Sequence, residues 1–504
     1  MTFLESDNLT LSALLFAKEP LGLLYIVASI IYFYLTTSKN LLIKLYILPS
    51  FLSDHSPVIV TLDFRASNKR GIYGWKFNSS LLNDTDFVNN MNGILTNTIA
   101  DFDVSFDPHI KWEMLKYEAR KFCMTFSKAK NMSKNRLKLK HEDVVKKYET
   151  STDKPSEHEY NESCLYLDTL IDERTKGAIL RSKCDWYENS EKSTNFFLNL
   201  EKRNSVNNTV KKLLVKNGDS NIEVTDSNEI LHNLHDFYSK LFEKKIHISS
   251  ESCTNFLDGV NIPKISEKHK IDCEADISLE DLKVSLFSMS SGKNPGNDGL
   301  TVEFYKNFWD SIKLVFFNSV QYSGIVGKLS TSQRQAIIKL LEKRDKDKRF
   351  VSNWRPISLL NVDTKIITKT FASKLVPVLP TIISSDQTAY VQGRFIGEST
   401  RLISDIIDMS DSLSLEGYIL TADIEKAFDS VDHTFLLACL EKFGFGQNIL
   451  KWVKILLNSN ESCVINGGTT SKYFPLRRGA RQGDPIAAYF FYFGSRNFLY
   501  YGAQ

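Results

Sequence analysis

The sequence predicts an α+β protein with three parts along its length. Residues 1–64 contain short runs of β-branched and aromatic residues, residues 65–265 are polar with helical patterns, and residues 266–504 mix helical periodicity with a hairpin signal. The chain has 504 residues, of which 42% are apolar, enough for several hydrophobic cores. Charged residues make up 24%, so most of the chain is expected to fold.

Residues 1–64 are expected to form strands, with candidates at Tyr25–Leu35 and Ile59–Phe64. Leu21–Leu35 is an uncharged apolar run of 15 residues, whereas a membrane span needs roughly 18, and its flanks do not match a signal peptide. We therefore favour buried strands and expect no membrane segment. A membrane-anchored protein stays open as an alternative on this run alone.

Residues 65–265 contain a strongly basic helical stretch. Lys111–Lys147 holds twelve Lys or Arg and only four Asp or Glu. Such a helix is either a solvated arm or a surface for an anionic partner, and a phosphate backbone is the partner we favour. A second patch, Ile179–Arg203, places aromatic residues beside cations. Its aromatics are able to stack on bases, but we favour core packing for most of them.

The seven cysteines indicate a reducing compartment. No two form a CxxC pair and their number is odd, which argues against a zinc knuckle or a disulfide framework. We expect buried, reduced thiols in a nuclear or cytoplasmic protein that is not secreted.

Residues 266–504 read as one α+β unit. A short amphipathic helix is expected at His433–Phe443, ended by Gly444, and another at Ile449–Leu457. A hairpin is expected between Ser462–Ile465 and Tyr473–Leu476.

Four motifs in this unit stand out, and three of them carry residues suited to phosphoryl chemistry. Within the segment from Tyr418 to Asp429, an apolar strand is expected to end at Asp423, whose carboxylate is able to hold Mg²⁺. Many Asp residues at the end of a strand, however, only cap the next helix. Lys343 and Arg355 are suited to a triphosphate. In a Gly-rich turn, Gln482 is able to bond a sugar or base, and Asp484-Pro485 to start the next helix. A compound turn, Gly292 to Thr301, precedes a helix and is expected to be structural.

The order of these motifs is more specific than any one of them. PGNDGLTVEFYK, NWRPISLLNVDTKI, QTAYVQGRFI, ADIEKAFDSVDH and GARQGDPIAAYFF together resemble the reverse transcriptases of LINE-type (non-LTR) retrotransposons over about residues 285–493. GWKFNSSLL, GAILRSKCDWYE and SEKSTNFFLNLEKR resemble the region that joins endonuclease to polymerase. LPSFLSDHSPVIV resembles the last strand and loop of the family's endonuclease.

The resemblance implies a right-hand polymerase whose fingers and incomplete palm occupy residues 266–504, after a helical basic linker at 65–265 and a remnant of an α/β endonuclease at 1–64. Its implied partners are an RNA template, a DNA primer or target, and deoxynucleoside triphosphates, with Mg²⁺ as cofactor; the oligomeric state is not indicated. The resemblance implies that Asp423 and Ile424 bind the metal and that Lys343 and Arg355 bind the triphosphate. It implies that Phe428 excludes a 2′-hydroxyl and that Gln482 and Gly483 contact the nucleotide. Asp429 is expected to cap the next helix.

The sequence also departs from the family pattern. No Asp-Asp pair occurs in the chain, which ends twenty residues after Asp484, so the aromatic-x-Asp-Asp motif and the thumb are not present. After Phe491 the apolar helix is expected to give way at Gly494. We therefore expect a truncated reverse transcriptase that does not polymerise DNA, or alternatively a non-catalytic nucleic-acid-binding remnant.

The endonuclease resemblance is likewise incomplete. Asp54 and His55 match the family's terminal pair, in which His acts as the base and Asp orients it. The other ligands of that site have no match here, so DNA nicking is not expected.

Overall fold

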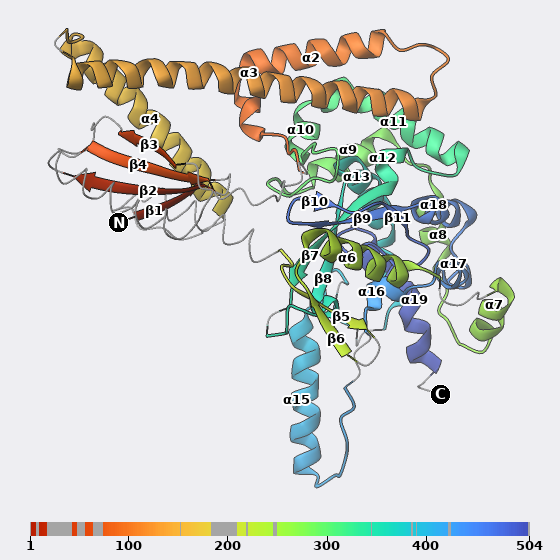
Figure 1. Ribbon diagram of the computed structural model, residues 1–504. Coiled ribbons are helices and arrows are strands. Elements are labelled where there is room, and N and C mark those ends of the chain that lie inside the picture. The colour runs from red at the N-terminus through yellow and green to blue at the C-terminus, as the bar shows by residue number, and fades with distance from the viewer. Residues whose placement is uncertain are drawn as a thin grey trace. The chain divides into compact units, whose positions relative to one another are not determined.

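The computed structural model shown in Figure 1 describes most of the chain. It divides into two compact units, of which the first comprises residues 1–70 and 126–208, and the second residues 71–125 and 209–504. The described residues are 2–6, 10–17, 43–47, 56–63, 74–151, 153–182, 209–217, 220–244, 249–343, 345–384, 387–389, 391–421 and 425–501.

The first unit contains a four-stranded antiparallel sheet with the order β1-β2-β4-β3. The predicted strand at Ile59–Phe64 is confirmed up to Asp63, where β4 ends. The candidate strand Tyr25–Leu35, the apolar run Leu21–Leu35 and the pair Asp54 and His55 lie outside the described residues. The strands are β1 (Thr2–Ser6), β2 (Thr10–Ala17), β3 (Ile43–Ile47) and β4 (Ser56–Asp63).

The basic stretch forms one continuous helix, as predicted, within the 43 residues of α3 (Pro108–Thr150). The part of α3 in the first unit packs on α4 (Glu157–Ser182) through ring contacts. Tyr148 stacks on Tyr160 with ring centroids 4.2 Å apart, and His141 lies 4.3 Å from Tyr166. The second predicted patch, Ile179–Arg203, lies largely outside the described residues. Of the helices in the described ranges, none is long and apolar enough to cross a membrane.

The second unit is built on a mixed five-stranded sheet. The order is β10-β9-β7-β8, with β11 paired to β9; β7 runs parallel to β9 and antiparallel to β8. The predicted hairpin is confirmed, since Phe474 pairs with Ser462 and Pro475 with Glu461. The strands are β7 (Gln335–Glu342), β8 (Trp354–Leu360), β9 (Glu461–Asn466), β10 (Thr469–Thr470) and β11 (Phe474–Pro475). A separate two-stranded sheet comprises β5 (Leu213–Asn217) and β6 (Ser220–Val224).

The helices of the second unit include both predicted amphipathic helices, α17 and α18. Gly444 follows α17 with φ of +90°, as expected of a helix-ending glycine. The bounds are η1 (Ser79–Asn83), α2 (Thr85–Ala100), α6 (Ser227–Phe242), α7 (Ser250–Asp258), α8 (Glu267–Glu274), α9 (Leu279–Phe287), α10 (Val302–Asn307), α11 (Trp309–Val326), α12 (Thr331–Arg334), η2 (Val351–Asn353), α13 (Val362–Leu375), α14 (Leu379–Ile382), α15 (Ile396–Ser412), α16 (Ala427–Ser430), α17 (His433–Lys442), α18 (Gln447–Leu457) and α19 (Ala487–Tyr501).

One hydrophobic core joins α6 to the sheet. The apolar face of α6, on which Leu234 and Tyr238 are almost fully buried, packs against strand residues such as Ile338 and Val464. Burial of such side chains stabilises the unit by roughly 1.5–3 kcal/mol each. The core therefore fixes the sheet that carries the Lys343 and Arg355 motif.

The prediction that the apolar helix gives way at Gly494 is wrong, because α19 continues to Tyr501. A Cβ on Gly494 would lie 3.2 Å from Val431. The missing side chain lets the helix pass close to Val431, so this glycine serves packing and does not end the helix.

A buried ionic network attaches the beginning of α3 to the second unit. Lys116 donates to Asp363 at 2.8 Å, and the Trp112 indole donates to the same carboxylate at 2.8 Å. Burial alone would raise the pKa of Asp363, but the charge and hydrogen bond of Lys116 hold it below its usual range. Lys116 therefore belongs to the core, so the expectation that the whole basic stretch is a solvated arm or a surface for an anionic partner is wrong for this residue.

Asp298, from the predicted compound turn, faces the same network. Its Oδ2 lies 3.9 Å from the Lys116 ammonium and accepts no hydrogen bond from the described residues. Burial raises the pKa of Asp298 to about 7, with the Lys116 charge opposing the rise. The turn is structural, as predicted: Asp298 accepts from the Leu300 amide at 3.0 Å, and α10 follows.

We predict that Lys116→Met destabilises the protein by roughly 3–5 kcal/mol, because Asp363 keeps a buried charge without a counterion. Chemical unfolding measures this loss. Lys121→Met, which removes a cation exposed on the same helix, is the control and should change stability by less than about 0.5 kcal/mol. Equal effects of both substitutions would contradict the role given to Lys116.

We predict that Asp298→Asn makes the protein more stable above pH 7 and no more stable near pH 4. A carboxyl whose pKa is raised by folding binds its proton more tightly in the folded protein than in the unfolded chain. Its ionisation therefore lowers the stability of the folded protein as pH rises from about 4 to 7. The amide removes this loss, a gain on the order of a few kcal/mol. Thermal unfolding of both proteins from pH 4 to 8 tests it; parallel pH curves would contradict it.

Candidate nucleotide site

The β7–β8 hairpin positions both cations of the predicted triphosphate motif. Arg355 pairs in register with Leu341, and the Lys343 amide donates to the Asn353 carbonyl at 3.0 Å. Arg355 is exposed and has no hydrogen-bond or ion-pair partner in the described part of the chain. The Lys343 ammonium donates to the Ser352 carbonyl at 3.0 Å. One guanidinium is therefore free to bind an anion beside a half-buried ammonium.

The Gly-rich turn is held on two sides by backbone hydrogen bonds. On one side, the Ser358 amide of β8 donates to the Gln482 carbonyl at 2.7 Å. On the other, the Gly479 amide donates to Val431 and the Ala480 amide to Phe428, both at 2.7 Å. The turn thus joins the strand that carries Arg355 to the segment that carries Phe428.

Two glycines make this close approach possible. Gly479 has φ of +80°, and a Cβ there would lie 2.7 Å from the Asp429 carbonyl oxygen. Gly483 has φ of +107°, and a Cβ there would lie 2.8 Å from the Ser358 carbonyl oxygen. Larger residues would force the turn away from both neighbours.

The Gln482 side chain contacts Asp429. Its amide nitrogen donates to the two carboxylate oxygens at 3.3 and 3.4 Å. Asp429 is 2% exposed and forms no ion pair with any residue in the described ranges. Burial raises its pKa to about 6, although the Gln482 hydrogen bond and three nearby cations oppose the rise; these are Lys426, Arg478 and Lys343. The bond from the Ser358 amide to the Gln482 carbonyl is the contact that brings the turn against the hairpin.

The expectation that Asp429 caps the next helix is wrong. Asp432 is the N-cap of α17 and accepts hydrogen bonds from the Thr434 and Phe435 amides at 2.8 and 3.0 Å. Asp429 lies within α16, three residues too early to reach those amides. Its carboxylate is turned toward Gln482 instead.

Phe428 lies beside this contact and is half-buried. Its ring stacks on Phe491 of α19, with centroids 5.2 Å apart and planes 30° apart. The stacking fixes the position of the ring that the sequence assigns to 2′-hydroxyl exclusion.

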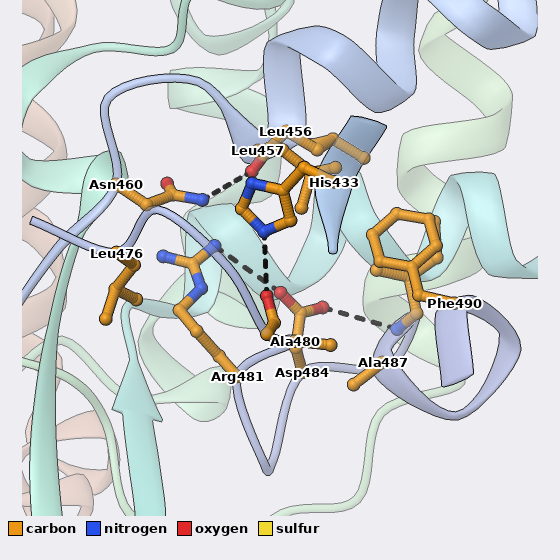
Figure 2. A pocket seen from close by; sticks show the side chains of 12 residues that line it. His433, Leu456, Leu457, Asn460, Leu476, Ala480, Arg481, Asp484, Ala487 and Phe490 are labelled. Atoms are coloured by element: carbon orange, nitrogen blue, oxygen red, sulfur yellow. Dashed lines mark hydrogen bonds and ion pairs between the residues drawn. The ribbon is translucent and has the colours of Figure 1, made fainter. Parts of the chain in front are cut away.

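A small pocket lies behind the turn (Figure 2). The His433 imidazole donates to the Gly479 carbonyl at 2.9 Å, and burial lowers the pKa of this histidine, which favours its neutral form. Arg481 and Asp484 form an ion pair at 3.4 Å, and each side chain is at most 6% exposed. Asp484 Oδ1 accepts from the Ile486 amide at 3.3 Å, just before α19, consistent with its predicted helix-starting role. These contacts support the turn from its inner side.

The predicted metal residues, Asp423 and Ile424, lie outside the described residues. Within the described ranges, no three His, Cys, Asp or Glu side chains form a group suited to a metal ion. Asp429, the nearby buried carboxylate, already accepts from Gln482 and does not supply such a group. Metal binding by Asp423 and Ile424 therefore stays a prediction.

Comparison with known proteins identifies the family of this part of the chain. The family model of the reverse transcriptases (RNA-dependent DNA polymerases) matches residues 341–498, which include the hairpin, Phe428 and the Gly-rich turn. Residues 341–498 therefore form a reverse transcriptase domain of the LINE (non-LTR) type. It is similar to an uncharacterised 149 kDa protein of transposon TX1 from Xenopus laevis, with 30% identity over 451 residues, covering 89% of this chain and 34% of that protein.

Two further relatives match a shorter part of this chain. The Pol polyprotein of the type-1 retrotransposable element R2 from Popillia japonica is 25% identical over 39% of this chain and 27% of the relative. The corresponding protein of element R2DM from Drosophila melanogaster is 26% identical over 43% of this chain and 20% of the relative. The chain spans about a third or less of the length of these relatives.

Two residues that hold Gln482 in place were not predicted from the sequence. Ser358 and Asp429 lie 124 and 53 residues from Gln482, yet both bond to it. Ser358 follows Arg355 within the same motif, and its place in the strand is the only signal that pointed to it. No local pattern distinguishes Asp429 from a helix cap.

We predict that Gly483→Ala destabilises the protein by roughly 1–3 kcal/mol and weakens nucleotide binding, because a methyl group would meet the Ser358 carbonyl at a strained φ. Thermal unfolding and nucleotide binding measure the two effects. Gly93→Ala is the control: it lies in α2 with nothing near its Cβ position and should be neutral or stabilising. Unchanged stability of Gly483→Ala would contradict the proposed constraint.

Proposed function

We propose that this chain binds an RNA template, a DNA primer and a deoxynucleoside triphosphate as part of an RNA-directed DNA polymerase. The observation that carries this proposal is that the Gly-rich turn bonds to the strand of Arg355 through Ser358, and that Gln482 of this turn contacts Asp429. The activity, substrates and partners of the whole protein rest on this proposal. Residues 266–504 form the fingers and part of the palm.

Each residue has a role suited to its chemistry. Arg355 binds phosphate oxygens with a planar fork, and Lys343 adds a compact charge. Phe428, held by Phe491, lies under the sugar and leaves no room for a 2′-hydroxyl. Asp423, with the Ile424 backbone, would hold Mg²⁺, which supplies charge stabilisation for nucleotidyl transfer. Since no Asp-Asp pair occurs in the sequence, we expect a polypeptide of these residues to bind substrates without extending a primer.

The exposed part of α3 supports a second candidate function, nucleic-acid binding without catalysis. Residues 128–140 are exposed on all sides and contain six cations and no acid. Lys134 pairs with Glu173 and Lys138 with Glu142, at 3.3 Å in the second pair. Lys128, Arg136 and Lys140 have no ion-pair partner in the described ranges, so they are free to contact phosphates.

The N-terminal unit has a separate proposed origin. We assign residues 1–64 to the end of an endonuclease domain, supported by β4, which directly follows Asp54 and His55. We expect no DNA cleavage from these residues alone, and a nicking assay on supercoiled DNA tests this.

We predict that the chain forms a ternary complex with an RNA template, a dideoxy-terminated DNA primer and the matching dNTP. Arg355→Ala should weaken dNTP retention about tenfold or more through loss of charged hydrogen bonds, while duplex binding stays unchanged. Replacing Lys128, Arg136 and Lys140 together by Ala should instead weaken duplex binding and reduce its salt dependence.

Arg401→Ala, on exposed α15 and paired with Asp405, is the matched control for the loss of one arginine. Duplex binding without dNTP retention would favour the non-catalytic function. Magnesium-dependent primer extension that is abolished by Asp423→Ala would refute the expected inactivity.

A further inference from the structure

Asp429 is a buried carboxylate in an unfavourable position for folding. Its oxygens form no ion pair in the described ranges, and their described side-chain partner is the neutral amide of Gln482. Burying a charge without a direct counterion lowers stability. The rise of its pKa to about 6 expresses this cost. If Asp429 served only to pack the fold, an uncharged side chain of the same shape would serve as well, so its charge calls for another role.

What the carboxylate does is fix the orientation of an amide. A carboxylate accepts hydrogen bonds and donates none, so only the NH₂ group of Gln482 is able to face it. The carbonyl Oε1 of Gln482 then points elsewhere, and it has no partner in the described ranges. The backbone of Gln482 is held independently by the Ser358 amide at 2.7 Å, so the amide is constrained at both ends.

We propose that Asp429 is a positioning residue that holds the Gln482 amide so that its carbonyl oxygen accepts a hydrogen bond from the bound nucleotide. This rests on the proposed nucleotide site and adds a selection rule to it. A triphosphate offers only acceptors at neutral pH, so the partner of Oε1 is a donor on the sugar or on the base. The 3′-hydroxyl and an exocyclic amino group are the two sources in dATP.

The test uses the full chain with an RNA template that presents uridine and a DNA primer with a dideoxy end, so no turnover is needed. Retention of labelled dATP is competed with dATP, with 2′,3′-dideoxy-ATP, which lacks the sugar donor, and with purine deoxyriboside triphosphate, which lacks the amino group. The unsubstituted chain should prefer dATP about tenfold over one of the two analogues, the equivalent of one hydrogen bond. The donor to Gln482 is identified by the analogue whose loss of affinity disappears in Gln482→Ala, because purine deoxyriboside triphosphate also lacks one hydrogen bond to the template uridine.

In Asp429→Asn the side chain is able to donate as well as accept, so the Gln482 amide is free to reverse. We expect the preference for dATP to fall to about twofold or less, and the same for Asp429→Ala and Gln482→Ala. The double variant Asp429→Ala/Gln482→Ala should be no worse than Gln482→Ala alone, because the two residues act as one unit. Asp405→Asn, an exposed acid on α15, is the control.

Stability separates positioning from packing. Asp429→Asn should unfold at a higher temperature than the unsubstituted chain at pH 8 and at the same temperature near pH 4, since it removes a charge whose burial is costly above about pH 6. Greater stability together with lost selectivity supports the proposal. Retained selectivity in Asp429→Asn and Asp429→Ala, or fully additive effects in the double variant, would overturn it. No dATP retention by the unsubstituted chain would overturn the proposed nucleotide site itself.

Discussion

The candidate site depends on three main-chain hydrogen bonds that hold the Gly-rich turn at Gly479–Gln482 from two sides, here called the backbone clamp. Ser358 holds Gln482 from the strand side, and Phe428 and Val431 hold Ala480 and Gly479 from the other. All three hydrogen bonds measure 2.7 Å, and the turn has no room for side chains where it touches its neighbours. Because the clamp uses main-chain atoms, it fixes side-chain positions without using the side chains that bind the ligand.

Two buried carboxylates show how the same group serves the fold and the site differently. Asp363 has the Lys116 ammonium at 2.8 Å and further N–H donors, and its pKa is lowered. Asp429 accepts from the neutral Gln482 amide and forms no ion pair with any described residue, and burial raises its pKa. The first arrangement stabilises the charged form and ties α3 to the unit. The second lowers stability, and departures of this kind are expected where a residue serves binding.

Local patterns predicted several elements correctly, but the prediction of an apolar strand before Asp423 is wrong over its described part, residues 418–421. These residues form no strand, and Tyr418 and Leu420 are exposed. Long-range contacts were beyond local patterns. The helices at α17 and α18 and the β9 hairpin follow from periodicity and turn residues within a dozen positions. Asp429 and Asp432 both precede α17 by a few residues, and only the fold decides which one caps it. Lys116 is one of twelve cations in its stretch, and its burial depends on Asp363, distant by 247 residues. The metal residue Asp423 stays a prediction.

The course of α3 limits where nucleic acid is able to bind. The sequence counts every cation of the stretch equally, but Lys116 is neutralised in the core by Asp363 and the nearby acids Glu113 and Asp298. The cations at 128–140, by contrast, have no acid within that range. A phosphate backbone binds most favourably to cations that are free in solvent and not already paired with buried acids. The exposed residues 128–140 of α3 are therefore expected to contribute to binding, and the buried Lys116 is not. Binding by α3 is therefore expected to be local to residues 128–140, and it is separable by substitution from the nucleotide site built on Ser358, Asp429 and Gln482.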